Sequence, residues 1–354
     1  MKIGFVVCFC FLIFFIVGCE DNQGETSVQT NAEEKAVEAK LEPLSFSDET
    51  FMFESSYGWL DNDTILYSAK REDEHYLFSY HLPSKEKKEL FTTREIIAQA
   101  SVSPNSKYIL VYAASNNTEA SIHFLDGEGN QQYSVSIPSS ELSFAWNPFS
   151  EDTLLIDSFY EDWTYKTYVC NVKQKTLEEV TIPQPFAQWY AKEDFLFLKW
   201  DDNSPQLSAP LMKYNKNSYV ENSLSQNVIA FEANKEVLFT INESKEDQNN
   251  LFYTVSDWKG NELNKWEIPA IRSYSDWMIP EFDIIEDQKS IIAFVPYDSA
   301  LIDQYDKQFQ LISYNWETGE REVLMEDMES APLIFSPEGN KCLYGNTLEN
   351  IIEF

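Results

Sequence analysis

The chain has 354 residues, with 26 Lys or Arg against 59 Asp or Glu, so its formal net charge is −33 at pH 7. This charge argues against a nucleic-acid-binding protein, because phosphate recognition needs clustered Lys and Arg. It also argues against adhesion of the folded part to anionic lipid. A neutral or cationic partner is compatible with it.

The first residues predict an export signal. Lys2 precedes an uncharged apolar stretch at 3–17, which is shorter than the roughly 20 residues of a spanning helix. The tetrapeptide IVGC at 16–19 then resembles a bacterial lipobox, the signal of lipoprotein signal peptidase. That resemblance implies removal of residues 1–18 and a diacylglycerol on the thiol of Cys19. The alternative is an ordinary signal anchor with an incidental cysteine.

The residues after Cys19 predict a tether. The segment 20–43 has no aromatic residue and little apolar content, so it cannot bury enough surface to offset its ordering entropy. We therefore expect three parts: a signal peptide at 1–18, a lipidated disordered tether at 19–43, and a folded body at 44–354. The expected location is the cell membrane, with the body held by lipid on the extracytoplasmic side.

The body contains a repeated hairpin. Its best copy is LIFSPEGNKCLYGN at 333–346, in which a strand, a turn and a second strand follow one another. Similar second strands recur every 41 to 54 residues, with apolar anchors at Leu66, Leu110, Leu155, Leu196, Leu238, Ile292 and Leu343. This count gives seven copies.

A second hairpin follows six of the seven copies. Its third strand ends at a polar residue before a turn, at His81, Asp126, Asn171, Asn215, Asp257 and Asn315. Five of these six are Asp or Asn, whose side chains bond turn backbone. Four short antiparallel strands per repeat predict an all-β fold, a single β-propeller of seven four-stranded blades. The last copy lacks an outer strand, so we expect the strand-like stretch at 44–53 to close the ring there.

These repeats resemble the TolB-type propeller repeat, whose inner strand is followed by Ser-Pro-Asp/Glu-Gly. SPEGN at 336–340 matches that motif, and SPNSK at 103–107 matches it in part. With the lipobox, the chain more specifically resembles the YqgU-like bacterial lipoproteins. The propeller of that family is described as six-bladed, so the resemblance implies six blades as the alternative count. It implies no defined activity.

Motifs of known chemistry are missing from the sequence. There is no Gly-x-Ser-x-Gly elbow, no His-Glu-x-x-His and no dinucleotide fingerprint. Once Cys19 carries lipid and the signal is removed, Cys170 and Cys342 remain, both in strand patterns typical of buried free thiols. We expect no cofactor. An enzyme is disfavoured but open, because propeller sites assemble from residues far apart in sequence.

The loops offer the candidate binding residues. Connections from second to third strand share one face of a propeller with connections between blades, and four of them here are rich in aromatic and acidic residues. The candidate ligand-binding residues are Tyr160, Asp162, Trp163, Trp200, Asp201, Tyr274, Trp277, Tyr297, Asp298 and Tyr305. Rings beside carboxylates suit a sugar, a peptide or a cationic group. Two other hypotheses remain: packing of the rings between blades, and calcium binding through Asp201, Asp202 and Asp303.

The leading hypothesis is a membrane-anchored binding module that recognises an extracellular protein or a wall polymer through this face. The first alternative is a hydrolase or lyase that acts on extracellular polymer through carboxylates on the same face. The second is an assembly scaffold without a small ligand.

The anchoring hypothesis predicts the behaviour of Cys19→Ala. Without the thiol there is no site for the diacylglycerol, so lipidation and the normal cleavage should both stop. Metabolic labelling with palmitate and fractionation of the cells would measure this. Labelled, membrane-held variant protein of normal size would contradict the lipobox.

Overall fold

The computed structural model describes residues 39–46, 50–116, 118–201, 206–244 and 249–354. The described residues belong to one compact unit, Glu38–Phe354. The predicted signal peptide, Cys19 and most of the predicted tether lie outside the described residues. Within that part of the chain, no helix is long and apolar enough to cross a membrane.

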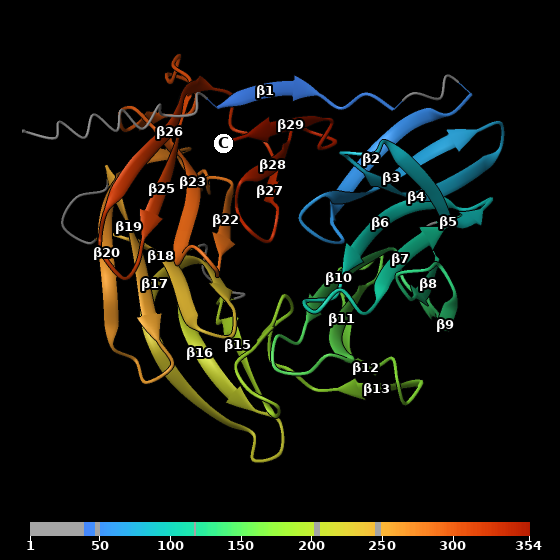
Figure 1. Ribbon diagram of the computed structural model, residues 1–354. Helices are drawn as coiled ribbons and strands as arrows, with labels where there is room; N and C mark the ends of the chain where they lie inside the picture. The colour runs from blue at the N-terminus through green and yellow to red at the C-terminus, as the bar shows by residue number, and fades with distance from the viewer. Residues whose placement is uncertain (1–38, 47–49, 117, 202–205, 245–248) are drawn as a thin grey trace, which may run out of the picture. The chain divides into compact units, whose positions relative to one another are not determined.

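The first three sheets follow chain order, each with four antiparallel strands (Figure 1). The first contains β2 (Met52–Trp59), β3 (Thr64–Arg71), β4 (Glu74–His81) and β5 (Glu86–Thr93). The second contains β6 (Ile96–Val102), β7 (Ile109–Ala114), β8 (Glu119–Leu125) and β9 (Gln131–Pro138). The third contains β10 (Glu141–Trp146), β11 (Thr153–Phe159), β12 (Tyr165–Asn171) and β13 (Thr176–Val180).

The fourth sheet has seven strands. They are β14 (Gln188–Trp189), β15 (Asp194–Leu198), β16 (Ala209–Asn215), β17 (Val220–Ala233), β18 (Val237–Glu243), β19 (Asn250–Asp257) and β20 (Glu262–Pro269). The long strand β17 pairs with β16 through its first half and with β18 through its second half, and Val228 takes part in both pairings. This sheet therefore holds two sets of four strands that share β17.

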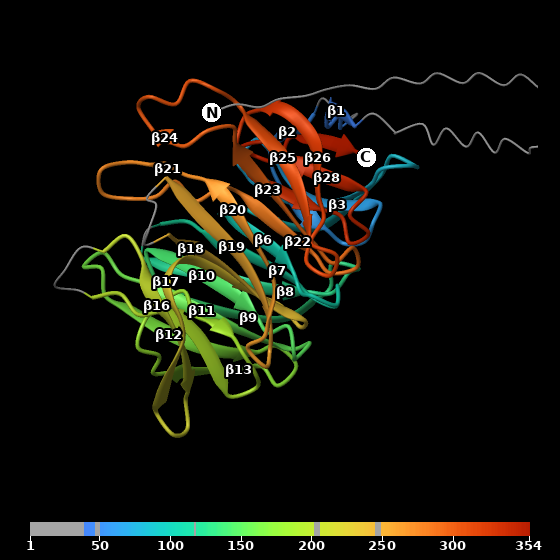
Figure 2. The ribbon, with the colours of Figure 1, turned by 90° about the vertical axis from the view of Figure 1, so that its left-hand side faces the viewer.

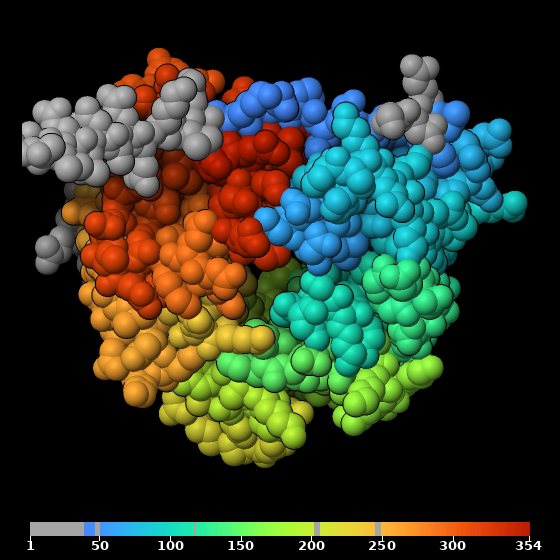
Figure 3. Space-filling model, viewed as in Figure 1, coloured from blue at the N-terminus to red at the C-terminus, as the bar shows by residue number. Residues whose placement is uncertain are grey.

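Two four-stranded sheets complete the body. One contains β22 (Phe282–Ile285), β23 (Ser290–Pro296), β25 (Phe309–Asn315) and β26 (Arg321–Met328). The other contains β27 (Leu333–Phe335), β28 (Lys341–Tyr344), β29 (Asn350–Glu353) and β1 (Lys40–Pro43). A short parallel pair joins β21 (Ile271–Arg272) to β24 (Ala300–Leu301). Successive sheets surround a central hollow, visible in Figure 3. The arrangement is a β-propeller, as the repeat predicts.

The outer strand of the last sheet differs from the prediction. The stretch at 44–53 was expected there, but the strand that pairs with β29 is β1, from Lys40↔Glu353 to Pro43↔Asn350. β1 lies within the segment predicted as tether. It runs along the top of Figure 1, beside the C-terminal strand.

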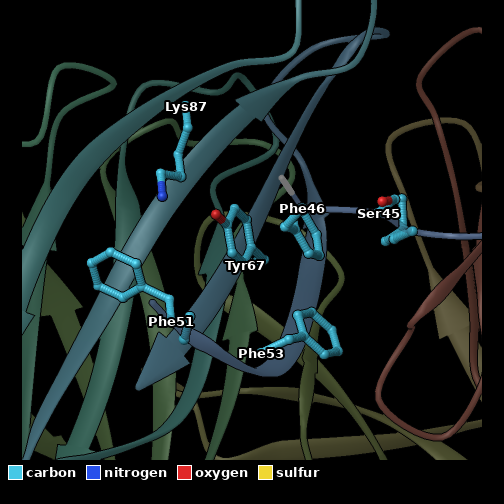
Figure 4. A pocket seen from close by; sticks show the side chains of 8 residues that line it. Ser45, Phe46, Phe51, Phe53, Tyr67 and Lys87 are labelled. Atoms are coloured by element: carbon cyan, nitrogen blue, oxygen red, sulfur yellow. The ribbon is translucent and has the colours of Figure 1, made fainter. Parts of the chain in front are cut away.

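Aromatic packing explains why 44–53 does not form that strand. The ring of Phe46 stacks on Tyr67 of β3 with centroids 4.0 Å apart, and Phe51 meets Phe78 of β4 edge-on at 5.1 Å. Figure 4 shows Phe46, Phe51 and Phe53 gathered around Tyr67. Burial of these rings on the first sheet contributes more to stability than an exposed strand pairing would, so the exposed residues before them, Lys40–Pro43, are left to pair with β29.

Hydrogen bonds from tryptophan side chains connect neighbouring sheets at their inner strands. Trp59 of β2 donates from Nε1 to the Ile334 carbonyl oxygen of β27 at 2.9 Å. Trp189 of β14 donates in the same way to the Ala145 carbonyl oxygen of β10 at 3.0 Å. Both tryptophans are buried, so each bond satisfies an indole N–H that has no access to water.

The turns between third and fourth strands form as the Asp and Asn pattern predicts. Asp126 accepts hydrogen bonds at Oδ1 from the amides of Glu128 and Asn130 at 3.0 and 2.9 Å. Gly129 in that turn has φ 89°, and a Cβ there would lie 2.6 Å from the Leu90 carbonyl oxygen. Both features make this turn specific to its sequence.

The two remaining cysteines are free and buried, as the strand patterns predict. Burial raises the pKa of the Cys170 thiol to about 12. A thiol in this state is protonated at neutral pH and acts as a small apolar side chain.

The pairing of β1 generates a stability prediction. A chain that begins at Leu44 lacks β1, whereas a matched chain that begins at Ala39 keeps it. The shorter chain loses the pairing with β29, which we expect to lower the free energy of unfolding by about 1–3 kcal/mol and to expose an edge that aggregates. Urea denaturation of both chains measures the difference. Coincident unfolding curves would show that β1 does not stabilise the ring.

Candidate functional site

The connections that carry the candidate residues lie at one end of the strands. They link second to third strands, as β11 to β12, or outer strands to the next inner strand, as β13 to β14. The pairing of β21 with β24 places the connection 270–281 beside the connection 297–308, as the strand order predicts (Figure 2).

An aromatic pocket opens among three of these connections. Its volume is about 450 Å³, within the range of small-molecule sites. We define it by the five rings that line it: Phe159, Tyr160, Trp163, Tyr165 and Phe186. Four of them come from the end of β11, the start of β12 and the loop between, whereas Phe186 comes from the connection that leads to β14.

The buried carboxylate of Asp157 in β11 holds the two segments together. Its Oδ1 accepts a hydrogen bond from Thr167 Oγ1 at 2.5 Å, and its Oδ2 accepts one from the Phe186 amide at 2.7 Å. Burial raises the pKa of Asp157, and these two hydrogen bonds oppose the rise. The ring of Phe186 then stacks on Phe159 with centroids 5.1 Å apart.

Trp163 is presented to solvent by a tight turn. Its amide donates to the Tyr160 carbonyl oxygen at 2.9 Å, and Asp162 Oδ1 accepts from the Thr164 amide and hydroxyl at 3.1 and 2.6 Å. These hydrogen bonds from Thr164 lower the pKa of Asp162. Asp162 therefore shapes the turn, and it is absent from the pocket lining.

Two pocket rings are exposed on strained backbone. Trp163 is 88% exposed with φ 66°, and Phe186 is 62% exposed with φ 59°. A left-handed conformation costs a non-glycine residue about 1–2 kcal/mol, and an exposed ring gains nothing from burial. The positive φ and the exposed ring area are therefore costs in the free protein, and the stacking of Phe186 on Phe159 is the one ring contact within the described residues that opposes them.

The other predicted residues are distributed around the ring of sheets. Trp200 and Asp201 follow β15, are exposed and border residues outside the described part of the chain. Tyr274 is 84% exposed in the connection between β21 and β22. Trp277 was expected beside it on the surface, but it is only 5% exposed and belongs to the core between the fourth and fifth sheets. Its place in the core does not suit contact with a ligand.

Three predicted residues hold the connection between β23 and β25 in shape. The Tyr305 hydroxyl donates to the Gln308 carbonyl oxygen at 2.6 Å and accepts from the Tyr297 amide at 3.1 Å. Asp298 forms an ion pair with Lys307. The side chains of Tyr305 and Asp298 therefore have partners within their own loop, whereas the Tyr297 hydroxyl donates to Asp327 Oδ1 of β26 at 3.0 Å.

Two carboxyl groups lie on inner strands at the central hollow. Burial, with a smaller contribution from the charge of Asp283, raises the pKa of Glu232 in β17 to about 7, against the hydrogen bond from Gln188 at 2.9 Å. Burial raises the pKa of Asp283 in β22 to about 6, while its Oδ2 accepts from the Phe335 amide at 2.7 Å. Both groups bond a neighbouring inner strand, so they serve first to join sheets.

Sequence reasoning missed Phe186, Phe159 and the two acids that line the pocket, Glu141 and Glu161. The tripeptide Pro183-Gln184-Pro185 before Phe186 was an available signal, because two prolines force an extended, exposed connection. Across the described ranges, no group of three or more His, Cys, Asp or Glu side chains is arranged to hold a metal ion.

Comparisons with known proteins agree with the propeller fold. The model of the YqgU-like 6-bladed beta propeller domain matches residues 81–345. The chain belongs to this family. The family description gives six blades, whereas the repeat in the sequence predicts seven, and the described residues form six sheets of four or more strands, one of which has seven strands.

The relatives carry little functional information. The uncharacterized lipoprotein YqgU of Bacillus subtilis (strain 168) is 25% identical over 349 residues, which cover 98% of this chain and 94% of that protein. A crystal structure of the uncharacterized protein lmo1340 from Listeria monocytogenes EGD-e matches with a TM-score of 0.78 and 22% identity, over 87% of this chain and 93% of that one.

A third structural neighbour is an enzyme. Oligogalacturonate lyase (VPA0088) from Vibrio parahaemolyticus matches with a TM-score of 0.59 and 10% identity, over 90% of this chain and 97% of that one. At this identity the likeness extends to the fold alone.

The role of Asp157 in the pocket can be tested by Asp157→Ala and Asp157→Asn. Alanine leaves the Phe186 amide without an acceptor, so the free energy of unfolding should fall by about 1–3 kcal/mol and that amide should exchange hydrogen faster. Asparagine keeps one acceptor oxygen for the Phe186 amide and can donate to Thr167, so most of the stability should return.

The same pair of variants has a pH signature. The pKa of Asp157 is raised in the folded state, so its contribution to stability is present at low pH and is lost as pH rises through the folded pKa. The asparagine variant should lack that step in urea denaturation between pH 4 and pH 8. Slow hydrogen exchange of the Phe186 amide in the Asp157→Ala variant would contradict the role of Asp157 as its acceptor.

Proposed function

We propose that this chain is a lipid-anchored extracytoplasmic binding module whose ligand site is the aromatic pocket. The observation that carries the proposal is the pair Trp163 and Phe186, two exposed rings on strained backbone around one cavity. A partner that covers these rings would offset both costs. An extracellular protein or a wall polymer bearing an apolar or cationic group is the expected partner class.

Anchoring at the membrane rests on the lipobox at 16–19 and on the lipoprotein relative. Lipid at Cys19 would hold the propeller outside the cell, near a membrane surface. The strongly negative body would not adhere to anionic lipid, so the loop face would stay open to partners.

We also infer seven structural blades. The shared strand β17 completes one set of four strands and begins the next, and each set contains an inner strand that faces the central hollow. The family name is consistent with the same sheets when the shared sheet is counted as one blade.

The alternative of a polymer-acting hydrolase or lyase has one observation in its favour. Glu141 and Glu161 line the aromatic pocket, so carboxylates lie within reach of a ligand held by the rings. An enzyme would release soluble fragments from the polymer, and Glu161→Gln would stop that release without loss of binding. A binding module would retain the intact polymer.

The proposal predicts where a partner contacts the protein. When p-benzoylphenylalanine replaces Trp163 in living cells, ultraviolet light should link the chain to one recurrent molecule. Tyr219 is the matched control position, because it is 71% exposed with φ 57° but lies in the turn between β16 and β17, at the other end of the strands. Gel shift and mass spectrometry of the adducts measure the difference.

Two outcomes separate the hypotheses. A product specific to position 163 that disappears in Phe186→Ala supports the pocket. Equal labelling at positions 163 and 219, or a product insensitive to Phe186→Ala, would overturn the pocket as the binding site and favour a scaffold without a small ligand.

A further inference from the structure

The aromatic pocket carries charge of one sign. Among the side chains that line it, Glu141 and Glu161 are the charged ones, and both are exposed at its rim. The chain as a whole has a net charge of −33, so the potential around the rim attracts cations and repels anions. The charges of the rim and of the whole chain therefore select against an anionic ligand.

Elsewhere the protein covers ring faces with its own cations. Lys213 Nζ lies 3.9 Å from the ring centroid of Tyr190, and Lys265 Nζ lies 3.9 Å from that of Phe252. Lys87 lies over Phe51 at 4.6 Å. A basic side chain over a ring is stabilised by electrostatic attraction to the negative face of that ring.

The pocket rings lack such a cover. Within the described ranges of the chain, none of the contacts between a basic side chain and a ring involves Trp163 or Phe186. The nearest lysine in sequence, Lys166, is paired with Glu179 at 2.8 Å. Two exposed ring faces beside two carboxylates thus have the composition of a cation site, but the chain does not supply the cation.

We propose that the aromatic pocket binds an organic cation whose charge is surrounded by methyl or methylene groups, of the quaternary ammonium type. The inference rests on the proposed function and names the ligand class of that site. Trp163 and Phe186 contact the alkyl surface of the cation through their ring faces. Glu141 and Glu161 balance its charge from the rim without direct hydrogen bonds.

The apolar walls decide the kind of cation. A primary ammonium is strongly hydrated and would lose its water in a pocket lined mainly by rings. A quaternary ammonium has no hydrogen-bond donor to leave unsatisfied, and its weak hydration makes transfer to aromatic walls favourable. The pocket therefore prefers the alkylated group over a free lysine side chain.

Choline is the probe, and 3,3-dimethylbutan-1-ol is its neutral isostere of the same shape. Isothermal titration of the lipid-free chain starting at Ala39 with each compound isolates the effect of charge. We expect saturable choline binding at least about tenfold tighter than binding of the isostere. A chitin tetrasaccharide serves as the neutral sugar probe.

Three variants assign the binding to the pocket. Trp163→Ala should weaken choline binding at least about tenfold, and Trp163→Gly should do the same while unfolding at an equal or higher temperature, because glycine relieves the positive φ. The double variant Glu141→Gln with Glu161→Gln should weaken choline about three- to tenfold and leave the isostere unchanged. Tyr219→Ala is the control and should change neither.

The outcomes distinguish this inference from the proposed function. Any of three results would overturn the assignment of a cationic ligand. They are equal affinity for choline and the isostere, no choline saturation below about 50 mM, and choline binding that is insensitive to Trp163→Gly. If choline does not bind and tetrasaccharide binding is sensitive to Trp163→Gly, the cationic ligand class is wrong, but the pocket is still the binding site. A position-specific crosslink at 163 remains the separate measure of the proposed function.

Discussion

The hydrogen bonds that join one inner strand to the next are the interactions on which this structure depends. An inner strand has a backbone ladder on one side and faces a neighbouring sheet on the other, so side chains must satisfy its free polar groups. Trp59 and Trp189 donate to carbonyl groups, and the carboxylate of Asp283 accepts an amide. Because these bonds set the angle between sheets, they also set how far apart the loops at the strand ends lie.

The circle is completed in two unusual ways. β17 continues from one set of strands into the next, which removes a connecting loop and joins the two sets into one seven-stranded sheet. At the other side of the chain, the four residues of β1 pair with the C-terminal strand β29. The last residues of the segment predicted as a tether, Lys40–Pro43, therefore belong to the fold.

The aromatic pocket depends on one structural hydrogen bond. Asp157 is buried in β11 and accepts the amide of Phe186 from the following connection, so a strand of one sheet positions a ring that leads to the next. The pocket is therefore held in place by a side-chain hydrogen bond between neighbouring segments, as the inner strands of the sheets are. The positive φ and the exposed ring area of Trp163 and Phe186 are costs in the free protein, and the proposed quaternary ammonium ligand would cover the rings.

The sequence by itself determined the all-β class, the four-stranded repeat and the Asp and Asn turns, because each depends on residues close in the chain. It also predicted Tyr160 and Trp163 as ligand-binding residues, and the structure places both in the lining of one pocket. It did not show that Trp277 is buried in the core while Tyr274 is exposed, or that Asp298 is paired within its own loop.

Only the tertiary structure decided those points, because packing against another sheet determines which side of a loop is covered. The same holds for β1 and for Phe186. The competition between 40–43 and 44–53 for the edge of β29 depends on ring stacking with Tyr67, and the place of Phe186 depends on a hydrogen bond that spans 29 residues.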